Sequence, residues 1–178
     1  DALDFIPFTN MLQDHYIIGL LSKFNKSLRT GQGITLTITN YPHTSIAHDR
    51  ERISEHFENW IKRVRRFAKK LGKQRPEYFW ICEIGDPPRT LKNGYTTIGF
   101  NVHIHALLFD CPLLPKSWVK RTWEEVTGDS YQVGTSKKSQ RAKRYVEKYL
   151  TKSLKGELTP TIVCNWVCGK RIWNKSPG

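Results

Sequence analysis

The sequence NVHIHALLF occupies residues 101–109 and has the composition of a buried β-strand, with apolar residues on both sides of two histidines. Side chains alternate across a strand with a period of two, so His103 and His105 project from one face and the residues between and beside them project from the other. Two imidazoles held side by side on a strand can offer two neutral nitrogens to one metal ion. Taken alone, the pair fits a metal site and a pair of half-buried structural histidines equally well.

A second strand, YFWICEIG at residues 78–85, precedes the histidine strand and is joined to it by a long turn over residues 85–99 that is rich in Pro and Gly. We expect the two strands to be antiparallel neighbours. Glu83 is an acid inside an otherwise apolar strand and needs a partner. A metal ion shared with His103 and His105 is one such partner, and it would keep open positions for water and phosphate oxygens. A salt bridge at the strand end is the alternative.

The remaining elements indicate an α+β fold, a central antiparallel sheet with helices packed on it. Residues 33–39, GITLTIT, alternate apolar residues with threonines as a strand does, and residues 131–133 predict a short edge strand. Apolar spacing predicts helices over residues 10–28, 49–71, 115–126 and 139–154. We expect a helical extension over residues 1–32, one domain over 33–156, and a C-terminal extension over 157–178 whose structure the sequence leaves unassigned. Because the chain begins with Asp1, we expect it to be excised from a longer protein.

The charge of the chain predicts a polyanionic partner. Lys and Arg number 29 against 16 Asp and Glu, a formal net charge of +13. There is no apolar run long enough to cross a bilayer and no signal peptide, so nucleic acid is favoured over a membrane. The polar face of the helix over residues 49–71 carries four candidate DNA contacts, for which a solvated charged face is the alternative. They are Arg63, Arg66, Lys69 and Lys70.

Four cysteines are too few and too scattered for a disulfide framework, which favours a reducing compartment. Cys164 and Cys168 have the spacing of half a zinc site, but no second pair of ligands accompanies them. We therefore interpret all four as packed residues or free thiols.

The helix over residues 139–154 contains KRYVEKYLTKS, in which Tyr145, Tyr149, Lys148 and Lys152 share one face. Apolar residues on the opposite side can hold the helix against the sheet. A lysine near a phenol favours the phenolate, and it can stabilise negative charge on a phosphate under attack. An ordinary amphipathic helix with snorkelling side chains is the alternative. Arg144, beside the first tyrosine, is a further candidate contact for nucleic acid.

The His-hydrophobic-His strand, the acid on the preceding strand and the downstream Tyr-x-x-Lys-Tyr-x-x-Lys helix together resemble the HUH endonucleases. The nearest resemblance is to two-tyrosine initiators of rolling-circle replication and to Helitron-type transposases, and ITLTIT at residues 34–39 matches the first motif of the family. The resemblance implies a ferredoxin-like or RRM-like sheet of about five strands. It also implies sequence-specific, metal-dependent nicking and joining of single-stranded DNA, through a 5′-phosphotyrosine and a free 3′-OH that initiates replication of a phage or plasmid.

The same resemblance implies that His103, His105 and Glu83 bind Mg²⁺ or Mn²⁺, and that Tyr145 and Tyr149 are nucleophiles assisted by Lys148 and Lys152. Two imidazoles suit zinc equally well. The long connection between Glu83 and His103 keeps other third ligands open, namely His43, His48 and Asp86. The implied partners are single-stranded DNA at an origin or element end, a host or fused helicase and a host polymerase, with no membrane. The implied location is the cytoplasm of a prokaryotic host.

Other interpretations explain less of the sequence. A histidine-triad hydrolase would need a histidine where the chain has Asn101, and it assigns no role to the tyrosine helix. A non-catalytic module could bind nucleic acid through aromatic and basic residues, but it assigns none to the paired histidines and tyrosines. Initiator and transposase nuclease domains share these motifs, so the sequence does not separate them.

Overall fold

The computed structural model describes residues 30–39, 44–85, 101–129, 132–138, 144, 148, 160–169 and 173–176. The helix predicted over residues 10–28 and the turn between the two central strands lie outside the described residues, apart from Gly85. In the helix predicted over residues 139–154 only Arg144 and Lys148 are described, and both are helical.

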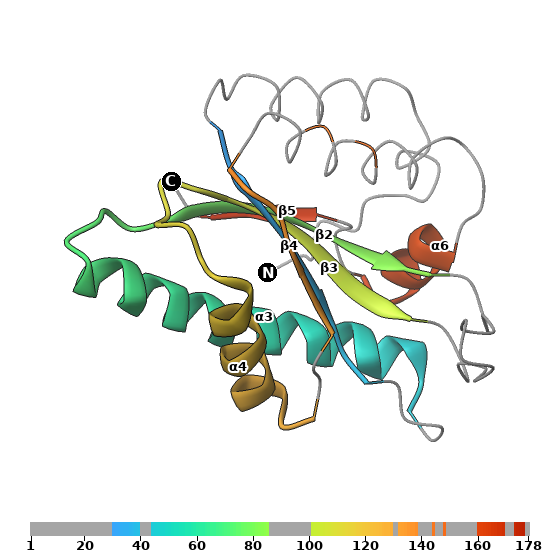
Figure 1. The fold of residues 1–178 in the computed structure, drawn as a ribbon. Coiled ribbons are helices and arrows are strands. Elements are labelled where there is room, and N and C mark those ends of the chain that lie inside the picture. Colours follow the sequence, from blue (N-terminus) through green and yellow to red (C-terminus); the bar gives the residue numbers. More distant parts are fainter. Residues whose placement is uncertain are drawn as a thin grey trace, which may run out of the picture.

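The centre of the molecule is a five-stranded sheet in which every pair of neighbouring strands is antiparallel (Figure 1). The strands lie in the order β4-β1-β3-β2-β5, so the histidine strand β3 occupies the middle position. This arrangement confirms the predicted α+β fold. The strands are β1 (Gln32–Thr37), β2 (Glu77–Ile84), β3 (Val102–Phe109), β4 (Val133–Thr135) and β5 (Trp173–Lys175).

The two edge strands are where the structure departs from the sequence prediction. The strand predicted at residues 131–133 is β4 at Val133–Thr135, which pairs with β1 two residues further along the chain. The fifth strand, β5, comes from the tail over residues 157–178 and pairs with β2. A three-residue strand carries no alternation long enough to be recognised, and its position depends on the partner strand that supplies its hydrogen bonds.

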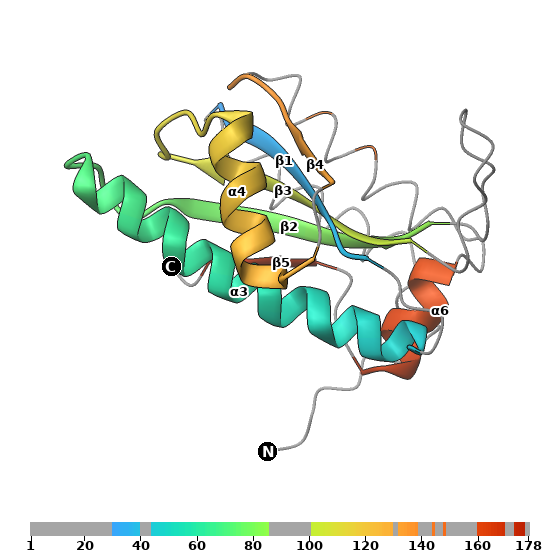
Figure 2. The same cartoon turned by 60° about the horizontal axis from the view of Figure 1, so that its bottom comes forward.

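Two helices, α3 (Ile46–Lys70) and α4 (Lys116–Thr127), cover the same face of the sheet (Figures 1 and 2). The Ser45 hydroxyl caps the start of α3 by accepting a hydrogen bond from the His48 backbone N–H at 3.1 Å. Gly128 ends α4 in the left-handed region at φ +81°, which glycine adopts without strain. Among the described helices, none combines the length and the apolar composition that crossing a membrane requires.

The hydrophobic core lies between this helical layer and the sheet, and it contains one of the two alternating sets of side chains from each central strand. Aromatic residues of both helices fill it, and two of them also hydrogen-bond across the layer. Trp60 Nε1 donates to Thr122 Oγ1 at 3.0 Å, and Trp123 Nε1 donates to the Thr37 carbonyl of β1 at 2.8 Å. The other set of side chains, which includes His103 and His105, therefore faces away from α3 and α4.

A third described helix, α6 (Pro160–Val167), fastens the C-terminal part of the chain to the end of β2. Thr161 Oγ1 accepts from the Ile84 N–H at 2.9 Å and donates to the Ile84 carbonyl at 3.2 Å. Asn165 Oδ1 accepts from Nε of the buried Arg50 of α3 at 2.6 Å. Because Ile84 adjoins Glu83, these contacts hold the strand at the point where its acidic side chain projects.

Candidate metal centre

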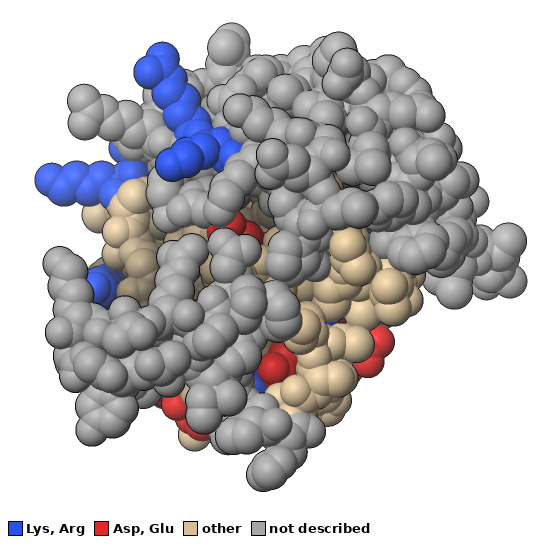
Figure 3. Space-filling model, turned by 90° about the vertical axis from the view of Figure 1, so that its right-hand side faces the viewer, with Lys and Arg blue, Asp and Glu red and all other residues tan. Residues whose placement is uncertain are grey.

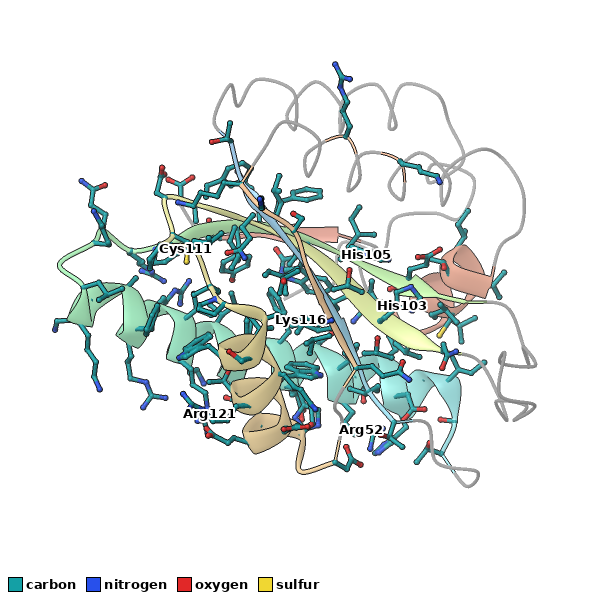
Figure 4. All side chains as sticks on the ribbon, viewed as in Figure 1. Arg52, His103, His105, Cys111, Lys116 and Arg121 are labelled. Atoms are coloured by element: carbon teal, nitrogen blue, oxygen red, sulfur yellow. The ribbon has the colours of Figure 1, made fainter. Side chains whose placement is uncertain are left out.

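The acid and the two histidines come from paired strands in a fixed register. Glu83 of β2 lies directly opposite His103 of β3, and Ile81 lies opposite His105. Residues opposite each other on neighbouring strands point to the same face, so the three polar side chains gather on the face turned away from α3 and α4 (Figure 4). The sheet register brings them together whatever the length of the connection between the strands.

The three side chains form a compact group of possible metal ligands. Glu83 Oε2 lies 2.9 Å from His103 Nε2 and 2.9 Å from His105 Nε2. The two imidazole rings stand nearly perpendicular, with their centroids 4.8 Å apart. One donor atom from each residue falls within 4.8 Å of the others, and among the described residues this is the group of three or more His, Cys, Asp and Glu that could hold a metal ion.

Burial differs among the three residues and indicates from which side the group is reached. The side chain of His105 is 3% exposed and that of Glu83 is 9% exposed, whereas that of His103 is 19% exposed. Access from solvent is therefore on the His103 side. Gly85 lies beside His103 there, and a Cβ added to it would come within 3.7 Å of the imidazole Cε1.

Glu83 is held as a carboxylate. Burial by itself raises the pKa of this carboxyl group, but hydrogen bonds and favourable charge interactions with His103 and His105 outweigh burial and place its pKa below the usual range. An ionised carboxylate between two imidazoles is the protonation state in which all three residues can bind a divalent cation.

Thr35 of β1 supports the buried histidine from the other side. It lies opposite His105 in the register, and its Oγ1 is 3.2 Å from His105 Nδ1. A hydroxyl acceptor on Nδ1 favours the tautomer whose Nε2 is free to bind a metal ion. Gly134 of β4 keeps space for this hydroxyl, since a Cβ there would come within 3.3 Å of Thr35 Cβ. Sequence reasoning missed Thr35, although the i, i+2 threonines of GITLTIT repeat the spacing of the histidines and were its available signal.

Of the alternative third ligands, only His48 is among the described residues. It is exposed in the first turn of α3, on the helical side of the sheet, and is not part of the group. His43 and Asp86 lie outside the described residues.

The tyrosine helix is described at two positions only. Arg144 and Lys148 are both helical and exposed, one turn apart. Tyr145, Tyr149 and Lys152 lie outside the described residues, so their roles stay predictions.

The basic residues predicted on the long helix do not join the metal group. All four lie on α3, which packs on the opposite face of the sheet. Arg63 is hydrogen-bonded to Glu125 of α4, and the other three are exposed. They are Arg66, Lys69 and Lys70.

None of the four cysteines forms a disulfide. Cys82 and Cys111 are buried, and Cys164 Sγ lies 3.9 Å from Cys168 Sγ within and just after α6. Burial, followed by the neighbouring Cys168, raises the pKa of Cys164 to about 12, which disfavours the thiolate needed to bind a metal ion. The interpretation as packed or free thiols agrees with this placement.

Comparison with known families supplies an independent observation. Residues 32–154, more than half of the chain, match the family model of the replication-associated proteins of the ORF2 type. The chain belongs to this family. Membership in this rolling-circle Rep-type family agrees with the resemblance to the HUH endonucleases. No curated protein and no solved structure matches the chain.

The match to the replication-associated family begins at β1 and ends beyond the last described residue of the tyrosine helix. It therefore contains Thr35, the three candidate ligands and the Tyr-x-x-Lys-Tyr-x-x-Lys segment. It ends before α6 and β5, which the structure nevertheless places against β2.

Proposed function

We propose that this chain is a metal-dependent, sequence-specific endonuclease and strand transferase for single-stranded DNA, which initiates rolling-circle replication of a phage or plasmid. The observation that carries the proposal is the Glu83, His103 and His105 group on one face of the central strands, in a chain of a replication-associated family. A replication role needs a chemical step at a phosphodiester, and this group together with the tyrosine helix contains the residue types for it.

The residues of the group fit a divalent cation. Ligand atoms at adjacent corners of an octahedron around Mg²⁺ would be about 3.0 Å apart, for metal–ligand distances of about 2.1 Å. The observed separation of 2.9 Å between Glu83 Oε2 and each histidine Nε2 is close to this value. A bound Mg²⁺ or Mn²⁺ would polarise the phosphate. The same donor set also suits zinc.

The chain supplies the nucleophile from the helix that follows β4. Tyr145 or Tyr149 attacks the phosphorus through its phenolate oxygen, the bond from phosphorus to the 3′ oxygen breaks, and that oxygen takes up a proton to become a free 3′-OH. The phosphorus remains bound to tyrosine, so the reverse reaction rejoins the strand without a nucleotide cofactor. Lys148 and Lys152 lower the pKa of the phenols and offset charge on the phosphate.

The proposed partners follow from the reaction. Single-stranded DNA at an origin is the substrate, with Arg144 beside the first tyrosine as a contact for its backbone. A helicase, fused or from the host, and a host polymerase would use the free 3′-OH. We place this reaction in the cytoplasm of a prokaryotic host.

The test is incubation of the protein with a pool of single-stranded oligonucleotides and Mn²⁺, followed by peptide mass spectrometry. We expect a tyrosine-linked nucleotide adduct that EDTA abolishes and that His103→Ala and His105→Ala both lose. His48→Ala is the matched control, because it removes an exposed histidine outside the group and should keep the adduct. Binding of the pool without any adduct would contradict the proposal and support a non-catalytic binding module.

A further inference from the structure

The C-terminal half of α3 and the turn after it carry a concentration of positive charge that the proposed cleavage site does not use. Eight cations occur between Lys62 and Arg75 with no Asp or Glu among them, whereas the first half of the helix carries four acids. The eight are Lys62, Arg63, Arg65, Arg66, Lys69, Lys70, Lys73 and Arg75.

Two of these eight cations are engaged within the protein. Arg63 is paired with Glu125 of α4, and the Arg65 guanidinium lies 5.7 Å from the centre of the Tyr78 ring. The other six are exposed, and none of them forms an ion pair with any residue that the structure describes. The cations of α4 differ, because Lys120 and Arg121 lie 3.9 Å from Glu124 and Glu125.

Four of the exposed cations form one stripe along the helix, here called the α3 stripe: Lys62, Arg66, Lys69 and Lys70. At about 100° per residue they fall within an arc of about 100°, centred opposite the buried side of α3. The stripe is about 12 Å long at 1.5 Å per residue, which matches three to four phosphate steps of about 3.4 Å along one DNA strand. The helix dipole accounts for Lys69 and Lys70 in the last turn but not for Lys62 and Arg66 earlier.

The α3 stripe cannot contact the same phosphates as the metal group. The α3 helix packs on the sheet face opposite to the one that carries His103 and His105, so the sheet lies between the two sites (Figures 1 and 4). Figure 3, which views the molecule from the side, shows that Lys and Arg atoms of described residues also gather apart from the visible Asp and Glu atoms there. A nucleic acid on the stripe must be a segment separate from the one that is cut.

We infer that the α3 stripe is a second, metal-independent binding surface for the sugar-phosphate backbone of DNA, and that it holds a duplex segment flanking the single strand at the metal group. A straight stripe of cations on a rigid helix matches the regular phosphate row of a duplex, whereas a flexible single strand would have to be ordered first. The inference goes beyond the proposed function and does not depend on nicking.

The test measures binding of a short duplex and of a single strand, both lacking any nicking site, by fluorescence anisotropy in EDTA over a series of salt concentrations. The variant carries Arg66→Gln, Lys69→Gln and Lys70→Gln. For the duplex we expect the slope of log affinity against log salt to become shallower by roughly 0.9 for each phosphate that a removed cation had neutralised, up to about 2.7. Because EDTA removes the metal, failure of the nicking proposal would not affect this result.

The matched control is Lys116→Gln, Lys120→Gln and Arg121→Gln, which removes the same charge from exposed positions on neighbouring α4 (Figure 4). We expect its slope on the duplex to change by less than the amount that one neutralised phosphate contributes. Equal losses of affinity in the two variants, or no loss in the first, would overturn the inference. A loss confined to the single-stranded probe would overturn the duplex assignment. Unchanged urea midpoints of both variants exclude misfolding as the cause of a loss.

Discussion

Thr35 Oγ1 lies 3.2 Å from Nδ1 of His105, while Nε2 of the same ring lies 2.9 Å from Glu83 Oε2. The imidazole thus spans from β1 to the carboxylate of β2. Hydrogen bonds to the second nitrogen of a metal-binding histidine set its tautomer and its orientation. Thr35 is accordingly a positioning residue for the candidate metal centre.

Thr35→Val should weaken Mn²⁺ binding by roughly 10- to 100-fold, because Nδ1 of His105 loses its hydroxyl partner while the shape of the residue is kept. Calorimetric titration with Mn²⁺ measures the change. Thr35→Ser keeps a hydroxyl and should restore most of the affinity. If Val and Ser weaken binding equally, packing of the threonine methyl group rather than the hydrogen bond is responsible.

Replacing the candidate ligands should separate metal binding from DNA binding. Glu83→Gln, His103→Ala and His105→Ala should each abolish detectable Mn²⁺ binding and adduct formation, since each removes one of three donors. Affinity for single-stranded DNA should remain largely intact, because phosphate contacts to Lys and Arg supply most of it. Calorimetry and anisotropy measure the two quantities, and His48→Ala is the control. Cleavage that persists in EDTA would contradict the metal requirement.

The two tyrosines should differ in the first cleavage. Tyr145 has Lys148 one turn and Lys152 two turns further along the helix, whereas Tyr149 has only Lys152 ahead of it. Tyr145→Phe should therefore lose most adduct on a short oligonucleotide, and Tyr149→Phe should keep the first cleavage but impair strand transfer from a preformed adduct. Peptide mapping decides the matter. An adduct found only on Tyr149 would reverse the assignment.

Asn165→Ala should destabilise the protein by roughly 1.5–3 kcal/mol, because it removes a hydrogen bond to the charged and buried Arg50. Urea unfolding measures the change in free energy. Asn59→Ala, on the exposed side of α3, is the control and should change stability by less than about 0.5 kcal/mol. Equal effects of the two substitutions would mean that α6 adds little to the stability of β2 and α3.

Cys111 should resist alkylation in the native protein. Burial raises the pKa of its thiol to about 12, so the folded chain keeps the proton well above the ordinary value of about 8.5 at which unfolded cysteine ionises. The same shift makes its contribution to stability fall as the pH rises above the unfolded pKa, because only the unfolded state releases the proton there. Iodoacetamide at mildly alkaline pH, followed by peptide mapping, should label the partly exposed Cys168 before Cys111. Labelling of native Cys111 as fast as in urea would contradict this.

The sequence by itself predicted the central strands, the long helix and the shorter helix after β3. Each of these has a local signal, such as the alternation around His103, the helical spacing of apolar residues before Gly72, or the Pro and Gly that flank α4. It also predicted that His103 and His105 share a face, because the period of a strand is local geometry.

Contacts between distant segments were decided by the tertiary structure. The register of β2 against β3 places Glu83 opposite His103 across a long connection, and the pairing of β1 with β3 places Thr35 against His105. The position of β5 and the placement of the basic α3 residues opposite the metal group depend in the same way on which faces are buried together. Periodicity states which side chains of one element share a face, but only the packing of elements, driven by burial of the apolar set, determines what each face meets.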